Sequence, residues 1–166
     1  MSTFVTVGNR NESFHRLLSS VSQISSLLPQ PVIVQYGHTQ FSDPNCKCID
    51  FLDGDTFVSH IQAATLIISH GGAGSILTCF LQSKRPLIVP RLSSNGEIVD
   101  DQQLELCRHL VERGKIYLCE DGDLAAFFSC TRPEQFECQN PPLPRVSDAL
   151  PALQSFSDLF SSLIKL

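Results

Sequence analysis

Short apolar runs that alternate with longer amphipathic segments are the feature that most restricts how this 166-residue chain can fold. Runs with the length and composition of buried strands lie at 4–7, 32–36, 48–50, 65–69, 86–90 and 116–118. Apolar residues at helical spacing fill the intervening segments at 12–28, 56–64, 76–82, 100–112 and 123–128. Leu27 belongs to the apolar face of the first of these segments, and Leu104, Cys107, Leu110 and Val111 are expected to face inward from the fourth. Because strands that alternate with helices pair in parallel, the sequence predicts an α/β protein with a parallel sheet and helices on both faces.

The charge balance limits the kinds of ligand that this chain can hold. Acidic residues outnumber basic residues, and the formal net charge is -5 at pH 7. We therefore expect no nucleic-acid partner, since such partners are held mainly by an excess of positive charge. An anionic ligand must instead be bound by a local arrangement of hydrogen-bond donors. No segment approaches the roughly 20 apolar residues that a membrane span needs.

The seven cysteines are odd in number and do not predict a disulfide framework. Cys79 and Cys107 fall within helical patterns, where they have the character of core thiols. Residues 1–3 lead directly into an apolar run without a signal peptide, so we expect a reduced, cytoplasmic protein. Cys46 and Cys48 lack a second pair of ligands, and the sequence predicts no metal site.

The composition divides the chain into three parts. Residues 1–130 contain all the predicted strands and form the expected ligand-binding domain. Residues 131–147 are rich in Pro, Gln and Asn and are predicted to be a linker. Residues 148–166 are amphipathic and predict a terminal helix, which either packs on the core or docks onto a partner.

A glycine-rich turn follows the most apolar of the predicted strands. The turn reads His70-Gly71-Gly72-Ala73-Gly74-Ser75 and leads into a helix. The first N–H groups of a helix have no internal partner, and glycines let a diphosphate approach them closely. Gly71, Gly72, Ala73, Gly74 and Ser75 are therefore predicted to bind a diphosphate. The alternative is a tight turn in which the glycines only relieve backbone strain, because the Walker A lysine and the GxGxxG spacing are both absent.

Two further groups of residues belong to the same end of the predicted sheet. Gly8 and Asn9 follow the first strand, so they can face the same ligand, or form an ordinary strand-to-helix turn. Near the start of a later helix, polar side chains either cap it or bind the hydroxyls of a sugar or ribose. These residues are Glu97, Asp100, Asp101, Gln102 and Gln103.

In their order and spacing, four of these segments resemble the glycosyltransferase family 28 C-terminal domain. They are 4–8, 67–75, 84–90 and 100–105, and the resemblance extends over about residues 3–128. More narrowly, the chain is similar to the small catalytic subunits of two-component UDP-sugar transferases. Those subunits build either dolichol-linked precursors or polysaccharides on a polyprenyl carrier.

The resemblance implies a Rossmann-like domain equivalent to the C-terminal, donor-binding half of a GT-B glycosyltransferase. His70 to Ser75 would line the diphosphate of a UDP-sugar, and Gly8 and Asn9 would form the opposite lip of the binding site. Asp101 and Gln103 would lie near the donor sugar or the ribose. It further implies inverting transfer to a polyprenyl- or dolichyl-diphosphate-linked acceptor without a metal or cofactor. A membrane-anchored partner subunit would supply the acceptor site and the general base, and recruit the chain to the cytosolic face of a membrane.

Several positions leave the substrate open. Asn9 stands where many relatives carry Thr, and Gly72 where Ala is common. Because of these departures the sequence does not choose between N-acetylglucosamine and a hexose as the donor sugar. His70 either hydrogen-bonds the donor phosphate or is a structural histidine. A UDP-sugar epimerase fragment and a non-catalytic nucleotide-sugar-binding or scaffold subunit are the alternative functions.

Overall fold

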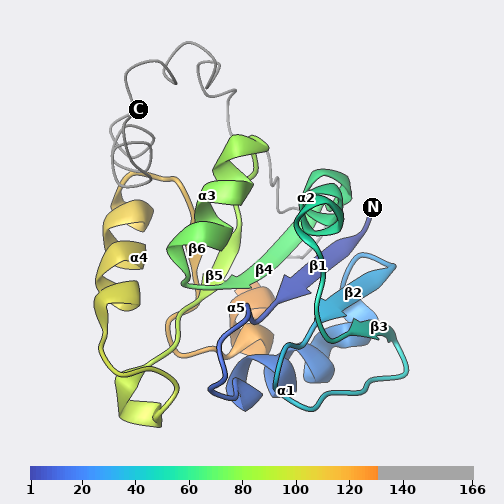
Figure 1. Cartoon of the computed structure of the whole chain (residues 1–166), viewed down its shortest axis with the longest axis horizontal. Coiled ribbons are helices and arrows are strands. Elements are labelled where there is room, and N and C mark those ends of the chain that lie inside the picture. Colours follow the sequence, from blue (N-terminus) through green and yellow to red (C-terminus); the bar gives the residue numbers. More distant parts are fainter. Residues whose placement is uncertain (131–166) are drawn as a thin grey trace.

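In the computed structural model, residues 1–130 are described, and their strands form a single parallel sheet (Figure 1). The order across the sheet is β3-β2-β1-β4-β5-β6. The strands are β1 (Thr3–Thr6), β2 (Val32–Gln35), β3 (Cys46–Ile49), β4 (Leu66–His70), β5 (Leu87–Val89) and β6 (Tyr117–Leu118). The predicted linker at 131–147 and the predicted terminal helix at 148–166 lie outside the described residues.

The helices cover both faces of the sheet, which confirms the predicted fold class (Figure 1). One face carries α1 (His15–Ile24), which is extended by a 3₁₀ turn (Ser25–Leu27), and α5 (Leu124–Cys130). The other face carries α2 (Gly54–Ala63), α3 (Ala73–Leu81) and α4 (Gln102–Glu112). A second 3₁₀ turn (Ser93–Asn95) lies in the loop before α4.

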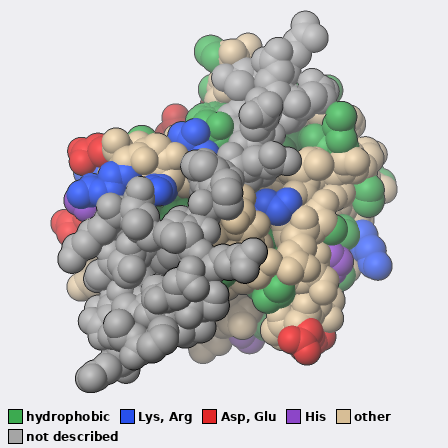
Figure 2. Space-filling model, turned by 90° about the horizontal axis from the view of Figure 1, so that it is seen from above, with side chains coloured by type: hydrophobic (Ala, Val, Ile, Leu, Met, Phe, Trp, Pro, Cys, Tyr) green, Lys and Arg blue, Asp and Glu red, His purple; other side chains and the backbone are tan. Residues whose placement is uncertain are grey.

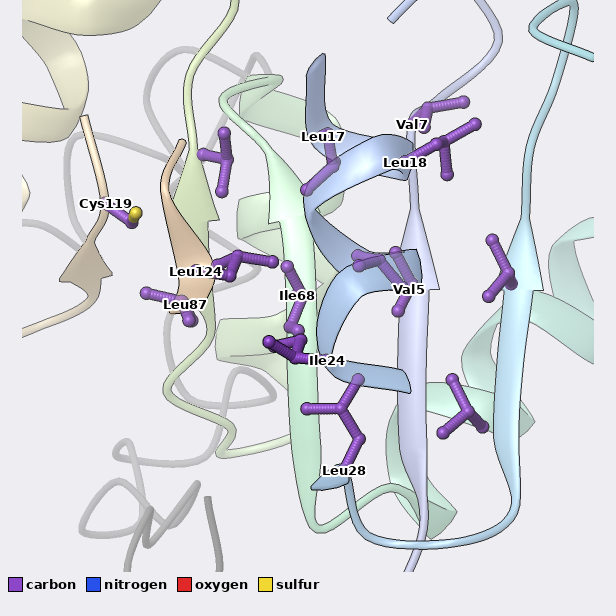
Figure 3. Packing of buried hydrophobic residues seen from close by; sticks show 14 of the residues in the cluster. Val5, Val7, Leu17, Leu18, Ile24, Leu28, Ile68, Leu87, Cys119 and Leu124 are labelled. Atoms are coloured by element: carbon purple, nitrogen blue, oxygen red, sulfur yellow. The ribbon is translucent and has the colours of Figure 1, made fainter. Parts of the chain in front are cut away.

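Alternate residues of the central strands fill separate hydrophobic cores on the two faces. On β1, Val5 packs towards α1, whereas Phe4 packs towards α2 on the other face. Figure 3 shows Ile68 of the neighbouring strand β4 beside Ile24 of α1, and Val7 beside Leu18 of the same helix. Because β1 and β4 are fully buried, the carboxyl ends of these two strands are held rigidly at one edge of the sheet.

The helix boundaries differ from the predicted ones at two places that matter for packing. The α1 helix begins at His15 rather than at residue 12, because residues 8–14 form the loop after β1. Leu27, predicted to face the core, is 66% exposed, because the 3₁₀ turn that contains it breaks the helical periodicity. Val111 in the last turn of α4 was also predicted to face inward and is exposed.

The glycine-rich turn is shorter in the structure than the sequence predicts. His70 is the last residue of β4, and α3 already begins at Ala73. Only Gly71 and Gly72 therefore connect the strand to the helix, and residues 73–75 form the first helical turn. The backbone N–H groups of the first turn of α3 therefore lie at the carboxyl edge of the sheet and point out of the end of the helix.

The surface of the described residues fits the acidic composition. On the face drawn in Figure 2, Lys and Arg side chains are scattered, and several lie next to Asp or Glu side chains. Among residues 1–130, no helix is long and apolar enough to cross a membrane.

Candidate functional site

A cavity of about 520 Å³ opens at the carboxyl ends of β1, β2 and β4, between α2 and α3. One side of the cavity is polar and the other is apolar. The cavity is lined by Gly8, Asn9, Gln35, Leu52, Gly54, Phe57, His70, Gly72, Gly74, Ser75, Leu77, Thr78 and Leu81. The fold thus brings together His70, the glycine-rich turn and the loop after β1, which the sequence placed at one edge of the sheet.

The polar side contains the start of α3. Gly72 is the N-cap residue, and its carbonyl accepts the first helical hydrogen bond, from the Ile76 N–H at 3.1 Å. The N–H groups of Ala73, Gly74 and Ser75 donate to no acceptor among the described residues. A Cβ atom built on Gly74 would have no neighbour within 4 Å. The start of α3 is therefore open, with free donors and the positive end of the helix dipole.

The His70 ring lies between the two glycine turns. A Cβ atom on Gly8 would lie 2.5 Å from the His70 Cε1, and one on Gly72 would lie 2.3 Å from the His70 Nε2. Gly8 also has a φ of +77°, which side chains rarely tolerate. A single buried imidazole thus explains why both turns that face the cavity require glycine.

Burial keeps the His70 ring neutral. Loss of hydration, together with the smaller effect of the nearby Arg91 guanidinium, lowers the pKa of His70 to about 4. The His70 Nδ1 has no hydrogen-bond partner among the described residues. At neutral pH the ring therefore offers one N–H donor and one lone pair, and carries no charge.

His70 is expected to make the fold less stable in mild acid. Its pKa is about 4 in the folded chain, against a usual value of 6.5. Between these values the unfolded chain binds more protons, so the free energy of unfolding increases with pH across this window. The complete change is about 3 kcal/mol. Urea unfolding from about pH 7 to about pH 4.5 measures it, and His70→Gln should flatten the profile over that range. An unchanged profile in the variant would contradict the assignment.

Gly72→Ala is expected to destabilise the fold by about 1–3 kcal/mol, because the added methyl overlaps His70. Gly8 restricts movement of the same end of the ring, since a Cβ atom there would lie 2.6 Å from the His70 Nε2. Gly54→Ala is the matched control: Gly54 is the first residue of α2, and a Cβ there meets nothing within 4 Å. Thermal unfolding of both variants tests the prediction, and equal melting temperatures would be inconsistent with it.

The predicted polar residues at the start of α4 do not line the cavity. The Asp101 carboxylate accepts hydrogen bonds from the Ser93 N–H at 2.9 Å and the Ser93 hydroxyl at 2.8 Å. Asp100 accepts from the Gln102 N–H at 3.1 Å, and the Gln102 side chain is exposed. Asp101 is the N-cap residue of α4, but its carboxylate orders the loop before the helix and does not cap it, whereas Asp100 binds the N–H of the first helical residue.

Gln103 is the member of this group that lies against the glycine-rich turn. A Cβ atom on Gly71 would be 3.4 Å from the Gln103 Oε1. This oxygen is buried and has no hydrogen-bond partner among the described residues. Gln103 thus presents an unsatisfied acceptor beside the turn, on the opposite side from the cavity residues of α2.

Glu97 is buried and does not line the cavity. Its carboxylate forms a two-point ion pair with Arg16, with distances of 3.0 Å to Nε and 2.8 Å to Nη2. It also accepts the Leu92 N–H at 3.0 Å. Because both carboxylate oxygens are already engaged, the structure gives Glu97 a role in holding the loop after β5 rather than in contacting a ligand.

Arg91 is a fully buried cation that was not predicted as a site residue. Its Nη2 donates to the Val7 carbonyl at 3.1 Å, and its Nη1 to the Glu12 carbonyl at 2.9 Å. The guanidinium also lies 4.5 Å from the centre of the Phe14 ring. Arg91 thereby fastens both ends of the loop that carries Gly8 and Asn9. The sequence signal was an arginine directly after a buried strand, in a chain with few basic residues.

The remaining described features do not form a second site of the predicted kind. A hollow of about 440 Å³ beside β6 and α5 contains none of the predicted site residues. Within residues 1–130, no group of three or more His, Cys, Asp or Glu side chains is arranged to hold a metal ion. Cys79 and Cys107 are buried in the hydrophobic core, as predicted.

Residues 2–123 match the glycosyltransferase family 28 C-terminal domain. Two proteins named UDP-N-acetylglucosamine transferase subunit ALG13 are also similar in sequence. The one from Homo sapiens is 34% identical over 127 residues, which are 70% of this chain and 11% of that protein. The one from Yarrowia lipolytica is 25% identical over 120 residues, which are 68% of this chain and 59% of that protein. The chain therefore spans less than two thirds of either relative.

Three solved structures share the fold. An NMR solution structure of ALG13 gives a TM-score of 0.58 at 17% identity and covers 94% of this chain and 96% of that one. The glycosyltransferase SnogD from Streptomyces nogalater gives 0.52 at 16% identity, over 99% of this chain and 42% of that one. The glycotransferase of kitacinnamycin gives a TM-score of 0.55 at 13% identity, and the match covers 99% of this chain and 38% of that one. The chain thus matches nearly all of the ALG13 structure and about two fifths of each of the other two chains.

Proposed function

Because the chain belongs to the glycosyltransferase family 28 C-terminal domain family, we propose that it is the donor-binding, catalytic subunit of a UDP-sugar glycosyltransferase. The observation that carries the proposal is the open start of α3, where the N–H groups of Ala73, Gly74 and Ser75 lack an acceptor among the described residues and where Gly74 and Ser75 line the cavity. Such a helix end binds a diphosphate without a lysine cluster, which suits a chain with a net charge of -5.

The two sides of the cavity match the two parts of a nucleoside diphosphate. The diphosphate would lie at the polar side, against Gly74, Ser75 and the neutral ring of His70. The uracil and ribose would extend over the apolar side, which Phe57 and Leu77 help to form. Ligand pockets commonly combine an apolar surface with a few orienting polar groups in this way.

The donor hydroxyls would be bound at the other side of the glycine-rich turn. Gln103 supports this placement, because its Oε1 is buried beside Gly71 without a partner. A sugar hydroxyl would satisfy that acceptor. Asp101 and Gln102 would contribute by holding the start of α4 in place.

In the proposed reaction, an acceptor hydroxyl attacks the anomeric carbon of the donor and inverts its configuration. The bond from that carbon to the phosphate oxygen breaks, and UDP leaves with the electron pair. The N–H groups of α3 would stabilise the charge that builds on the leaving diphosphate. A base removes the acceptor proton, and we assign it to the partner subunit because His70 would already contact the donor phosphate. No cofactor and no metal are expected in this scheme.

The names of the sequence relatives favour UDP-N-acetylglucosamine as the donor and a second subunit as the partner. We propose that this partner is membrane-anchored, binds a lipid-linked acceptor and recruits the chain to the cytosolic face. Hexoses remain alternative donors.

The proposal is tested by a thermal-shift screen of UDP-sugars, followed by calorimetry with UDP, on the chain alone and with its co-expressed partner. A donor that binds the native state raises the melting temperature. Transfer to a lipid-linked acceptor is expected only with the partner. Failure to bind UDP in both preparations would support the scaffold alternative, and UDP-sugar turnover without acceptor would support the epimerase alternative.

A further inference from the structure

Three polar side chains, two of them buried, form a continuous hydrogen-bonded chain beneath one lip of the cavity. The Gly8 N–H donates to the Thr6 hydroxyl oxygen at 3.1 Å. The Thr6 hydroxyl donates to the Gln35 Oε1 at 2.6 Å, and the Gln35 Nε2 donates to the Asn9 Oδ1 at 3.1 Å. Thr6 and Gln35 are buried, whereas Asn9 is exposed and lines the cavity.

The direction of this hydrogen-bonded chain follows from its first members. The Gly8 N–H can only donate, so the Thr6 oxygen must accept and its hydrogen is available for Gln35. A separation of 2.6 Å is typical of O–H···O and shorter than usual for N–H···O, which places the Gln35 oxygen, not its nitrogen, against Thr6. The Gln35 NH₂ group then faces Asn9, and the Asn9 oxygen must accept.

The consequence is a fixed orientation for the Asn9 amide. Its oxygen is engaged by Gln35, and its Nδ2 has no partner among the described residues. We propose that Gln35 is a positioning residue that holds the Asn9 NH₂ group towards the cavity as a donor, so that the site selects an oxyanion such as a nucleoside diphosphate oxygen. This inference rests on the proposed function for its ligand, but its geometry is that of the free chain.

The fixed orientation of the Asn9 amide matters for anion binding at this lip of the cavity. Asn9 and the start of α3 line the same cavity from the loop after β1 and the loop after β4, respectively. A freely rotating asparagine would present its oxygen as readily as its nitrogen, and the oxygen would repel a phosphate. With the oxygen held by Gln35, Asn9 adds a donor to those of the helix end. Gln35 also lines the cavity, but its Oε1 accepts from Thr6 and its Nε2 donates to Asn9, so its proposed action is through Asn9.

A double-mutant cycle in the full chain, with UDP as the probe, tests whether Gln35 positions the Asn9 side chain or only supports the fold. Asn9→Ala should weaken UDP binding about tenfold, through loss of a hydrogen bond to a charged group. Gln35→Met should weaken it about fivefold, because the ligand must then immobilise the Asn9 side chain itself. In the Asn9→Ala background, Gln35→Met should have no further effect. Gln30→Met is the control, since Gln30 also bonds through its side-chain amide, to the Ser25 carbonyl, but does not line the cavity.

Side-chain NMR without ligand tests the orientation independently. The Gln35 NH₂ protons should exchange slowly with solvent and shift in Asn9→Ala, while the Asn9 NH₂ protons should exchange rapidly. Slow exchange of the Asn9 NH₂ protons would overturn the inference, because it would show that Asn9 donates to Gln35.

The outcomes distinguish this inference from the proposed function. If the native chain binds UDP but Gln35→Met weakens binding equally in both backgrounds, or not at all, Gln35 is not a positioning residue. If the native chain does not bind UDP even with its partner, the proposed function fails. The exchange rates of the two amides then decide the orientation by themselves.

Discussion

Gly74→Val is expected to weaken UDP binding by about 100-fold or more, because the branched side chain would stand over the open start of α3. A Cβ at Gly74 meets no atom within 4 Å, so the space that it would enter belongs to the cavity. A displaced diphosphate would lose at least two charge-assisted hydrogen bonds, each of which contributes about 1.5–3 kcal/mol. Calorimetry with UDP measures the loss directly.

Gly74→Ala provides the control for folding in the same position. Alanine is favoured over glycine in a helix by up to about 1 kcal/mol, so this variant should unfold at a higher temperature than the native chain. Its methyl should still weaken UDP binding, although less than valine does. In Gly74→Ala the melting temperature should therefore rise while the affinity for UDP falls. If Gly74→Val folds normally and binds UDP as tightly as the native chain, the diphosphate does not bind at the start of α3.

Arg91→Met is expected to lower the free energy of unfolding by about 3–5 kcal/mol, the largest stability effect that we predict for a single side chain. Methionine keeps the apolar contact with Phe14 but donates no hydrogen bonds. The carbonyls of Val7 and Glu12, which Arg91 binds in the interior, would lose their partner. Urea unfolding at neutral pH gives the measurement.

Arg108→Met is the matched control for that prediction. Arg108 forms an ion pair with Glu120, and its side chain is 57% exposed. Solvent-exposed pairs contribute about 0–1 kcal/mol, so this variant should unfold almost like the native chain. Equal destabilisation by the two substitutions would mean that Arg91 has no special role in fastening the loop after β1.

The parallel sheet and its cores were predictable because their signals are local. The apolar run that became β4 and the helical spacing of Leu104, Cys107 and Leu110 identify their elements without any tertiary information. All three of these helix residues are buried. The predictions for Leu27 and Val111 were wrong, since the periodicity of a helix does not show where the helix ends or how far its last turn is covered.

The glycine-rich turn was likewise visible as a diphosphate-binding candidate, but its geometry was not. The sequence placed His70 in the loop, whereas the structure makes it the last residue of β4. Gln35 carried no signal at all, because a glutamine at the end of a strand is usually a solvated residue. Its role depends on Thr6 and Asn9, which are 29 and 26 residues away along the chain.

By itself, the sequence determined the order of strands and helices, the apolar faces that build two cores, and the glycines that leave the start of α3 open. These properties depend on spacings within a few residues. Only the tertiary structure decided which polar groups meet: Glu97 with Arg16, Arg91 with the loop after β1, and Gln35 with Asn9. Such pairings arise when parallel strands bring together loops that are far apart in the chain, and a buried polar group bonds to whichever partner that register places within reach.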